Sequence, residues 1–333
     1  MQFRSISSCR QQGVSTPLVL VIVAILVIAG WWFSANNSDQ ANPTETAAED
    51  AVEPEAESPP PRALVDDARI QAAAEMEPGS WLSYGRTFEE QRFSPLDQIN
   101  TDTVNDLGVA WFKDLDTIHP LEATPLVVDG VMYFTAPWNI TYALDAQSGE
   151  EIWRYDPQVP GATARQACCG VISRGLAAYQ GHIYIATLDG RLIALDAANG
   201  SPVWEVDTVI DRSRSYTITG APRVAAGKVY IGNGGAEYGV RGFISAYDVD
   251  SGDVIWRFYT VPGNPELGFE NDAMKMAAET WNGQWWELGG GGGTVWDAMA
   301  YDPDLDLMYI GVGNGTPWNR EIRSPGGGDN LFL

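Results

Sequence analysis

Short apolar runs alternate with glycine- and aspartate-rich turns through the middle of the chain. Three segments, residues 143–153, 194–204 and 246–256, share one spacing of Ala, Asp, Gly and Trp, and each follows a strand-like run at residues 131–134, 182–185 or 228–231. The Asp and Gly are typical of a tight turn between two antiparallel strands. The unit recurs about every fifty residues, which predicts the blades of a β-propeller or a related array.

A tryptophan ends each repeated segment, four residues after its glycine. We expect Trp153, Trp204 and Trp256 to dock between neighbouring sheets. A large ring there buries apolar surface that a single sheet would leave exposed. Trp111 is expected to close an earlier, less regular unit. Ordinary core packing would explain a single tryptophan, but three at matched positions favour the array.

The N-terminal part has a different pattern. Residues 1–16 are basic and residues 17–33 are apolar. A basic segment followed by an apolar one is typical of a bacterial export signal or membrane anchor. We favour an uncleaved anchor, since no Ala-x-Ala cleavage site is clear. Residues 34–61 are acidic and Pro-rich, which predicts a disordered tether. A short helix is expected over residues 65–75, and residues 62–333 form the predicted β-domain.

Composition agrees with an all-β chain. There are 35 glycines and 13 tryptophans among 333 residues, which favours many short strands. The net charge of −24 argues against nucleic acid as a partner, because phosphates would be repelled. With His119 and His182 as the only histidines, a histidine-rich metal centre is excluded.

Two adjacent cysteines, Cys168 and Cys169, are unusual. Neighbouring Cα atoms lie about 3.8 Å apart, below the usual disulfide range, so a bond between them would close a strained ring. Such a ring would restrict the unfolded chain very little and would stabilise the fold very little. The pair is therefore either two reduced thiols packed as small hydrophobes or a feature with a functional role. An oxidising periplasm would allow the bond, and Cys9 would lie on the reducing side.

Two glycine-rich stretches, residues 232–242 and 289–293, lie near Glu237 and Trp296. Neither is a dinucleotide-binding fingerprint, because no helical pattern follows to present its N-terminus to a phosphate. The glycines suit either close approach of the backbone to a flat ligand or loops at the edges of the blades.

Several motifs in residues 62–333 resemble those of the quinoprotein alcohol dehydrogenases, which use pyrroloquinoline quinone (PQQ). They include Trp-Leu-Ser-Tyr-Gly-Arg at residues 81–86, the Cys-Cys segment, Ala-Glu-Tyr-Gly-Val-Arg-Gly at 236–242 and Gly-Asn-Gly-Thr-Pro-Trp-Asn-Arg at 313–320. The resemblance implies an eight-bladed propeller of four-stranded antiparallel sheets, of which this chain encodes about the first half. It also implies a quinone lying flat between a Cys168–Cys169 disulfide and the ring of Trp296.

The same resemblance implies a metal site and further cofactor contacts. Glu237 and Asn314 match the ligands of a Ca²⁺ ion, whose preference is for oxygen, and a lanthanide is the alternative. Beside the quinone this ion would act as a Lewis acid. The residues that match other cofactor contacts are Glu122, Arg174, Thr219, Gly235, Ala236 and Thr294. One position departs from the methanol-oxidising branch: Gly234 replaces a serine, which favours an ethanol-type or general alcohol dehydrogenase.

The implied reaction is oxidation of a primary alcohol to an aldehyde, with electrons passed to a periplasmic cytochrome c or a membrane quinone. The protein would lie on the periplasmic side of the inner membrane, anchored or, if the signal is cleaved, free. The family's general-base aspartate is expected beyond Leu333, so we expect a part of a longer protein with little activity alone. The alternative is a non-catalytic periplasmic propeller scaffold, which would have no reason to keep the cofactor residues together.

Overall fold

Four antiparallel sheets form the framework of residues 62–333, the part of the chain that the computed structural model describes. By its internal contacts the chain divides into Met1–Glu57 and Ser58–Leu333, and the described residues belong to the second unit. The predicted basic segment, anchor and tether lie outside them. Among the described residues, no helix is long and apolar enough to cross a membrane.

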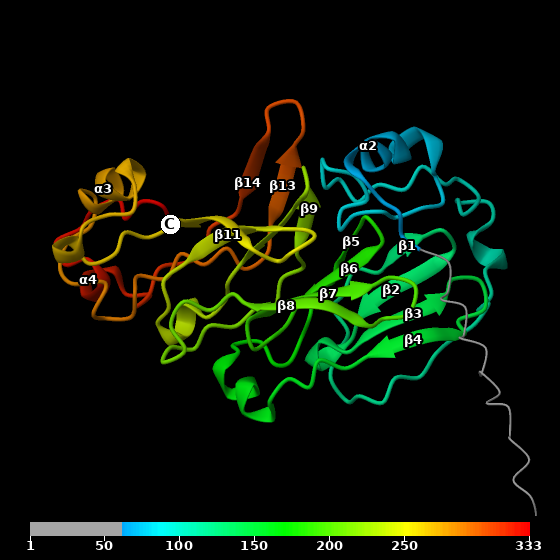
Figure 1. Cartoon of the computed structure of the whole chain (residues 1–333), viewed down its shortest axis with the longest axis horizontal. Coiled ribbons are helices and arrows are strands. Elements are labelled where there is room, and N and C mark those ends of the chain that lie inside the picture. Colours follow the sequence, from blue (N-terminus) through cyan, green and yellow to red (C-terminus); the bar gives the residue numbers. More distant parts are fainter. Residues whose placement is uncertain (1–61) are drawn as a thin grey trace, which may run out of the picture. The chain divides into compact units, whose positions relative to one another are not determined.

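Three sheets have four strands each, paired in chain order, as an up-and-down meander (Figure 1). The first contains β1 (Leu126–Val128), β2 (Val131–Thr135), β3 (Thr141–Asp145) and β4 (Glu151–Tyr155). The second contains β5 (Ala177–Tyr179), β6 (His182–Ala186), β7 (Arg191–Asp196) and β8 (Pro202–Asp207). The third contains β9 (Arg223–Ala225), β10 (Lys228–Gly232), β11 (Phe243–Asp248) and β12 (Val254–Tyr259). The predicted strand–turn–strand units are thereby confirmed.

A fourth sheet has two strands, β13 (Met299–Asp302) and β14 (Leu307–Ile310). The first strands of successive sheets lie together, since β9 contacts both β5 and β13. Propeller blades place their first strands around the axis in this way. The number of blades in the whole protein stays a prediction.

Helices are few and short. Helix α2 (Asp67–Met76) lies where residues 65–75 predicted one, and Asp66 caps it by accepting a hydrogen bond from the Arg69 amide at 2.8 Å. The sequence did not predict α3 (Asp272–Ala278) or α4 (Arg320–Arg323). The 3₁₀ turns are η1 (Val104–Asp106), η2 (Pro137–Asn139), η3 (Gly161–Gln166), η4 (Ala236–Tyr238) and η5 (Pro265–Leu267).

Trp153 on β4 shows how one sheet docks on the next. Its indole Nε1 donates a hydrogen bond to the carbonyl oxygen of Ala197, in the β7–β8 turn of the second sheet, at 3.0 Å. The ring covers Gly200 so closely that a Cβ there would lie 2.6 Å from a ring carbon. Only glycine fits under the ring, which explains why the Gly and the Trp recur together in the repeat.

The same contact recurs on both sides of Trp153. Trp204 donates to the carbonyl oxygen of Val249 at 3.0 Å and covers Gly252. Trp111 donates to the carbonyl oxygen of Ala146 at 3.2 Å. The predicted inter-sheet role is confirmed for Trp153 and Trp204, and Trp111 makes the same contact with the first sheet. Among the described residues Trp256, which is 38% exposed, does not make this contact.

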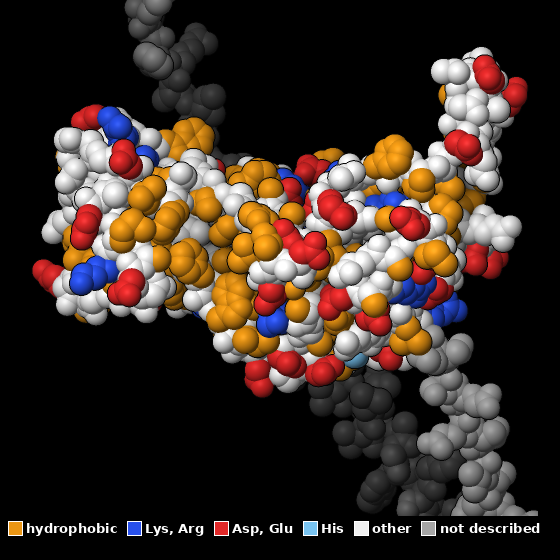
Figure 2. Space-filling model, turned by 90° about the horizontal axis from the view of Figure 1, so that it is seen from above, with side chains coloured by type: hydrophobic (Ala, Val, Ile, Leu, Met, Phe, Trp, Pro, Cys, Tyr) orange, Lys and Arg blue, Asp and Glu red, His pale blue; other side chains and the backbone are white. Residues whose placement is uncertain are grey.

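The surface is acidic, as the net charge of −24 requires. Figure 2 shows acidic and hydrophobic side chains interspersed over the face seen from above, with fewer basic ones. Some exposed hydrophobic side chains belong to the two-stranded sheet and its turn: Leu305, Leu307 and Tyr309.

Candidate functional site

A cavity of about 180 Å³ brings together most of the predicted site residues. Its walls come from the loops that join the sheets and from those between β10 and β11 and after β14. The lining residues are Cys168, Cys169, Arg174, Thr217, Thr219, Gly234, Gly235, Glu237, Thr294, Trp296 and Asn314. Residues up to 146 positions apart in the sequence therefore form one site (314 − 168).

Arg174 connects several walls of the cavity. Its Nη1 donates to Thr219 Oγ1 at 2.6 Å, and its guanidinium carbon lies 4.9 Å from the centre of the Trp296 ring. Nη2 lies 3.6 Å from a carboxylate oxygen of Glu122. The backbone is fixed as well, because the Arg174 amide donates to the Thr219 carbonyl at 3.0 Å. A half-buried, oriented cation is thus available to a ligand with carboxylate or carbonyl oxygens.

Trp296 presents its ring to the cavity with 45% of the residue exposed. Its backbone is closely packed, since a Cβ at Gly220 would lie 2.4 Å from the Trp296 carbonyl oxygen. An aromatic ring that is open to solvent and fixed at its backbone offers a flat apolar surface for stacking.

Both cysteines are exposed free thiols in the structure. The predicted disulfide is not formed there and stays a prediction for the oxidised protein. The pKa of Cys168 is raised to about 12. The main cause is loss of solvent around its thiol, followed by the neighbouring Cys169 and the negative charge of Glu237. The reduced Cys168 is therefore poorly nucleophilic at neutral pH, because the thiolate is the reactive form.

Glu237 and Asn314 bring two oxygen-bearing side chains, which could serve as metal ligands, to the cavity. Within residues 62–333 the Glu237 carboxylate forms no hydrogen bond or ion pair. Asn314 uses its amide nitrogen to donate to the Gly315 carbonyl at 3.3 Å, which leaves the amide oxygen free. A carboxylate and an amide oxygen without partners fit a hard cation such as Ca²⁺, provided that further ligands come from a cofactor or water. The described residues contain no cluster of three or more His, Cys, Asp or Glu side chains with metal-binding geometry.

The glycine stretches serve the site in two ways. Gly234 and Gly235 line the cavity, and Gly235 has φ 102°, a conformation that glycine adopts without strain. Gly289, Gly290, Gly291, Gly292 and Gly293 all have positive φ but do not line it. Gly290 and Gly292 pack against other backbone, and Gly291 and Gly293 pack against side chains, including that of Val261. The Gly293 amide donates to the Asn314 carbonyl at 2.9 Å. This run holds the loop of Asn314 in place and does not contact the cavity itself.

Two predicted contacts lie outside the cavity lining. Glu122 is exposed and reaches the site through Arg174, while Ala236 is buried behind the wall. Thr217 lines the cavity but was not predicted, although it lies two residues before Thr219, the spacing that places side chains on one side of an extended segment. Gly234 is closely packed too, since a Cβ there would lie 3.3 Å from Thr217.

The four-stranded antiparallel sheets, with the first strands of successive sheets in contact, define a propeller-like fold. A family profile described as "PQQ: Glucose/ethanol/alcohol dehydrogenase, beta-propeller domain" matches residues 81–325, and the chain belongs to that family.

Its relatives are alcohol dehydrogenases by name. Quinohemoprotein alcohol dehydrogenase ADH IIB of Pseudomonas putida is 60% identical over 270 residues, which cover 81% of this chain and 39% of the relative. A 1-butanol dehydrogenase (cytochrome c) of Thauera butanivorans is 46% identical over 264 residues, which cover 76% and 37%. The chain thus spans about two-fifths of the length of these relatives.

Solved structures of alcohol dehydrogenases have the same fold as this chain. The structure of quinohemoprotein alcohol dehydrogenase ADHIIG from Pseudomonas putida superposes with a TM-score of 0.80 at 56% identity, covering 84% of this chain and 40% of that one. A europium-containing methanol dehydrogenase superposes with a TM-score of 0.70 at 37% identity, covering 79% and 47%. The predicted family and the propeller-like, all-β fold are confirmed.

Proposed function

We propose that this chain forms the cofactor-binding part of a PQQ-dependent dehydrogenase that oxidises a primary alcohol to an aldehyde. The observation that carries the proposal is the single cavity in which Cys168, Arg174, Glu237, Trp296 and Asn314 meet. A scaffold has no use for this combination of thiols, cation, oxygen donors and exposed ring. When bound there, PQQ would accept the hydride that leaves the alcohol carbon.

The residues of the cavity fit a flat, anionic ligand. Trp296 would carry one face and the cysteine pair the other, while the Arg174 guanidinium would bind carboxylate or carbonyl oxygens. The hydroxyls of Thr219 and Thr294 would donate hydrogen bonds at the edge. A disulfide between Cys168 and Cys169 would replace two thiols by a rigid apolar surface.

We propose Ca²⁺ as the metal, held by Glu237 and Asn314 together with oxygen atoms of the cofactor. Its charge would polarise a cofactor carbonyl. A lanthanide is the alternative, because a methanol dehydrogenase with this fold is described as containing europium. The two ions can be compared in the same titration.

The proposed reaction also implies partners for the whole protein. A small alcohol is the substrate, and a cytochrome c or a membrane quinone is the electron acceptor; the name of the butanol dehydrogenase relative supports the cytochrome. We place the domain on the periplasmic side of the bacterial inner membrane, tethered through residues 17–33. The oxidising periplasm suits the proposed disulfide.

Two substitutions test the metal site. In Glu237→Ala and Asn314→Ala, addition of Ca²⁺ should no longer strengthen PQQ binding, because each variant loses an oxygen ligand. Calorimetric titration of PQQ with and without Ca²⁺ measures this, and we expect at least about a tenfold loss, since a bond to a charged group contributes about 1.5–3 kcal/mol. Glu266→Ala, far from the cavity lining, is the control. If both site variants kept the wild-type dependence on Ca²⁺, the metal assignment would be wrong.

A further inference from the structure

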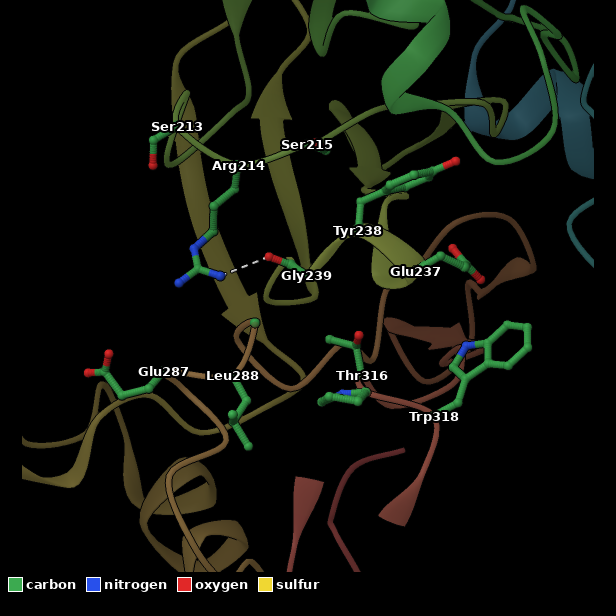
Figure 3. Close-up of a pocket in the computed structure, with 12 residues that line it drawn as sticks. Ser213, Arg214, Ser215, Glu237, Tyr238, Gly239, Glu287, Leu288, Thr316 and Trp318 are labelled. Carbon is green, nitrogen blue, oxygen red and sulfur yellow. Dashed lines mark hydrogen bonds between the residues drawn. The ribbon is translucent and has the colours of Figure 1, made fainter. Parts of the chain in front are cut away.

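A cleft of about 370 Å³ lies next to the cofactor cavity, and we call it the Asp297 cleft. Trp296 lines the cofactor cavity and the next residue, Asp297, lines the cleft, so one short segment of backbone borders both spaces. The cleft shares no lining residue with the cofactor cavity, or with the hollow that adjoins that cavity at Glu237 and is drawn in Figure 3. The proposed function therefore gives its residues no role.

Four charged side chains, two of each sign, line the Asp297 cleft together with two tyrosines: Glu90, Arg92, Arg223, Asp297, Tyr84 and Tyr309. Arg223 Nε donates to Glu90 Oε1 at 2.8 Å, and the two side chains are only 7% and 18% exposed. The guanidinium carbons of Arg223 and Arg92 lie 3.9 and 4.3 Å from the centre of the Tyr84 ring. A buried pair of this kind adds little net stability, because removing both charges from water offsets their attraction.

The loop that carries Glu90 is held in a strained conformation. Glu90 and Arg92 have φ 54° and 55°, in the left-handed region that residues other than glycine rarely adopt. The Arg92 amide closes the loop by donating to the Gly85 carbonyl at 3.0 Å. A Cβ at Gly85 would lie 2.3 Å from the Glu90 Cα, so only glycine fits there. Strain that the surroundings hold in place is concentrated at functional positions, which points to a role for Glu90.

Arg223 connects Glu90 to the backbone of Trp296. Its Nη1 donates to the Ala221 carbonyl at 2.8 Å, which fixes the segment just before β9. The neighbouring Gly220 packs on Trp296 itself, since a Cβ there would lie 2.4 Å from the Trp296 carbonyl oxygen. A change in the position of Arg223 would therefore reach the residue whose ring lines the cofactor cavity.

Asp297 is a second acceptor in the same cleft. In the part of the chain that the structure describes, its Oδ1 is buried and has no hydrogen-bond partner. Besides Glu90 it is the other acid that lines the cleft. If Arg223 lost the charge of Glu90, it would be a buried cation without a counterion, which is costly, and Asp297 would be the acceptor available to it.

We propose that Glu90 is a positioning residue for the cofactor, whose charge keeps Arg223 away from Asp297 and so holds the Trp296 ring in place for stacking. When Glu90 loses its charge, Arg223 turns to Asp297, and the backbone of the adjoining Trp296 moves with it. This inference rests on the proposed function. It goes further by assigning a role to a residue that does not line the cofactor cavity.

Acidification should produce the same change in the wild-type chain. Burial raises the pKa of Glu90 above its usual range. The negative charge of Asp297 raises this pKa further, whereas Arg223 and Arg92 lower it. As the pH falls, Glu90 should take up a proton above the ordinary glutamate value of about 4.3. The Glu90–Arg223 pair should thus break while ordinary carboxylates are still charged.

The position of the Trp296 ring is measured by ¹⁹F NMR on the full chain labelled with 5-fluorotryptophan, without PQQ. The Trp296 signal is assigned by its loss in Trp296→Phe. We expect the signal to shift as the pH is lowered from about 8 to about 5, with a midpoint above the usual glutamate value. In Glu90→Gln the signal should stay at the low-pH position throughout, because the amide has no charge to pair with Arg223.

Three further variants separate Glu90 from its neighbours. Glu90→Asp keeps a carboxylate and should keep the response to pH. Glu89→Gln is the matched control and should behave as wild type, because Glu89 is exposed and does not line the cleft. Glu122→Gln should also keep the response, since Glu122 approaches the Trp296 ring through Arg174 and not through Arg223.

A wild-type signal that does not move between about pH 8 and pH 5 would overturn the role of Glu90, whatever the folding of the variants. A shift that persists in Glu90→Gln, or that disappears in Glu122→Gln, would overturn it as well. Far-UV circular dichroism checks that each variant is folded.

Titration of PQQ separates this inference from the proposed function. At neutral pH, Glu90→Gln should bind PQQ about two- to tenfold more weakly than wild type, the range that one stacked ring contributes. Equal affinity of the two would refute a role of Glu90 toward the cofactor while leaving the proposed function intact. A Glu90-dependent signal in a chain that binds no PQQ would support the link from Glu90 to Trp296 and refute the cofactor assignment instead.

Discussion

Arg174 contacts three other side chains at the cavity. It bonds Thr219, stacks on Trp296 and faces Glu122, so it orients a wall, a ring and a carboxylate together. A lysine would keep the charge but lose the planar fork that makes these contacts simultaneous.

Replacement of Arg174 should therefore weaken PQQ binding even when the charge is kept. We expect a loss of about tenfold for Arg174→Lys and about a hundredfold for Arg174→Ala, since hydrogen bonds to charged groups contribute about 1.5–3 kcal/mol. Calorimetric titration measures the affinity, and far-UV circular dichroism checks that each variant is folded. Equal affinity of wild type and Arg174→Lys would contradict this role.

The cysteine pair allows a second prediction at the scale of residues. In the Cys9→Ser variant only Cys168 and Cys169 can react, and we expect the oxidised protein to take up no thiol reagent until a reductant is added. In the reduced protein the pKa of Cys168 is raised to about 12, so alkylation of Cys168 at pH 8 should be slow and should accelerate when denaturant unfolds the chain. Mass spectrometry counts the labels. Immediate labelling of both cysteines in oxidised, folded protein would exclude the disulfide.

The sequence predicted most of this site because its residues occur in recognisable motifs. Cys168, Glu237 and Asn314 each lie in such a motif, and the cavity contains them all. Thr217 could be found only by noticing that it alternates with Thr219. The position of Ala236 behind the wall depends on the left-handed turn at Gly235, which a motif match does not specify.

At the scale of elements, Trp153 and Trp204 each hold one sheet to the next by covering a glycine in its turn. Trp153 is 7% exposed, bonds the Ala197 carbonyl and covers Gly200, whereas Trp256 is 38% exposed. The two occupy the same position in the repeat, so they form a natural pair for comparison.

Trp153→Ala should destabilise the protein by about 3–5 kcal/mol, the usual effect of removing a large buried aromatic side chain. Trp256→Ala should have a clearly smaller effect, because less of its surface is buried. Urea unfolding followed by circular dichroism gives the free energies. Equal losses in the two variants would show that burial against the next turn is not what stabilises the array.

The repeat predicted the strands well because the same Asp, Gly and Trp positions recur in each unit. It could not predict α3, which lies between the third and fourth sheets, outside the repeat. There the Asn271 side chain accepts a hydrogen bond from the Met274 amide at 2.9 Å, a cap that is visible in the sequence only once the helix is known. Nor could it predict that the five-glycine run would pack closely on distant loops, because that depends on contacts far apart in the sequence.

At the scale of the whole molecule, the chain belongs to the PQQ propeller family and spans about two-fifths of the length of its curated relatives. Within residues 62–333, the loops that join the sheets create a cavity with the chemistry that a flat, anionic, metal-assisted cofactor needs. Cofactor binding is therefore the property that this chain should show by itself.

Equilibrium titration of PQQ into the folded chain with Ca²⁺ tests that claim most directly. The account predicts saturable binding of one PQQ per chain, accompanied by quenching of tryptophan fluorescence, and weaker binding after chelation of the metal. Trp296→Ala should weaken it by about tenfold or more, since a stacked ring contributes about 0.5–1.5 kcal/mol beyond the surface that it buries. Absence of saturable binding, or binding that neither chelation nor Trp296→Ala changes, would contradict the account.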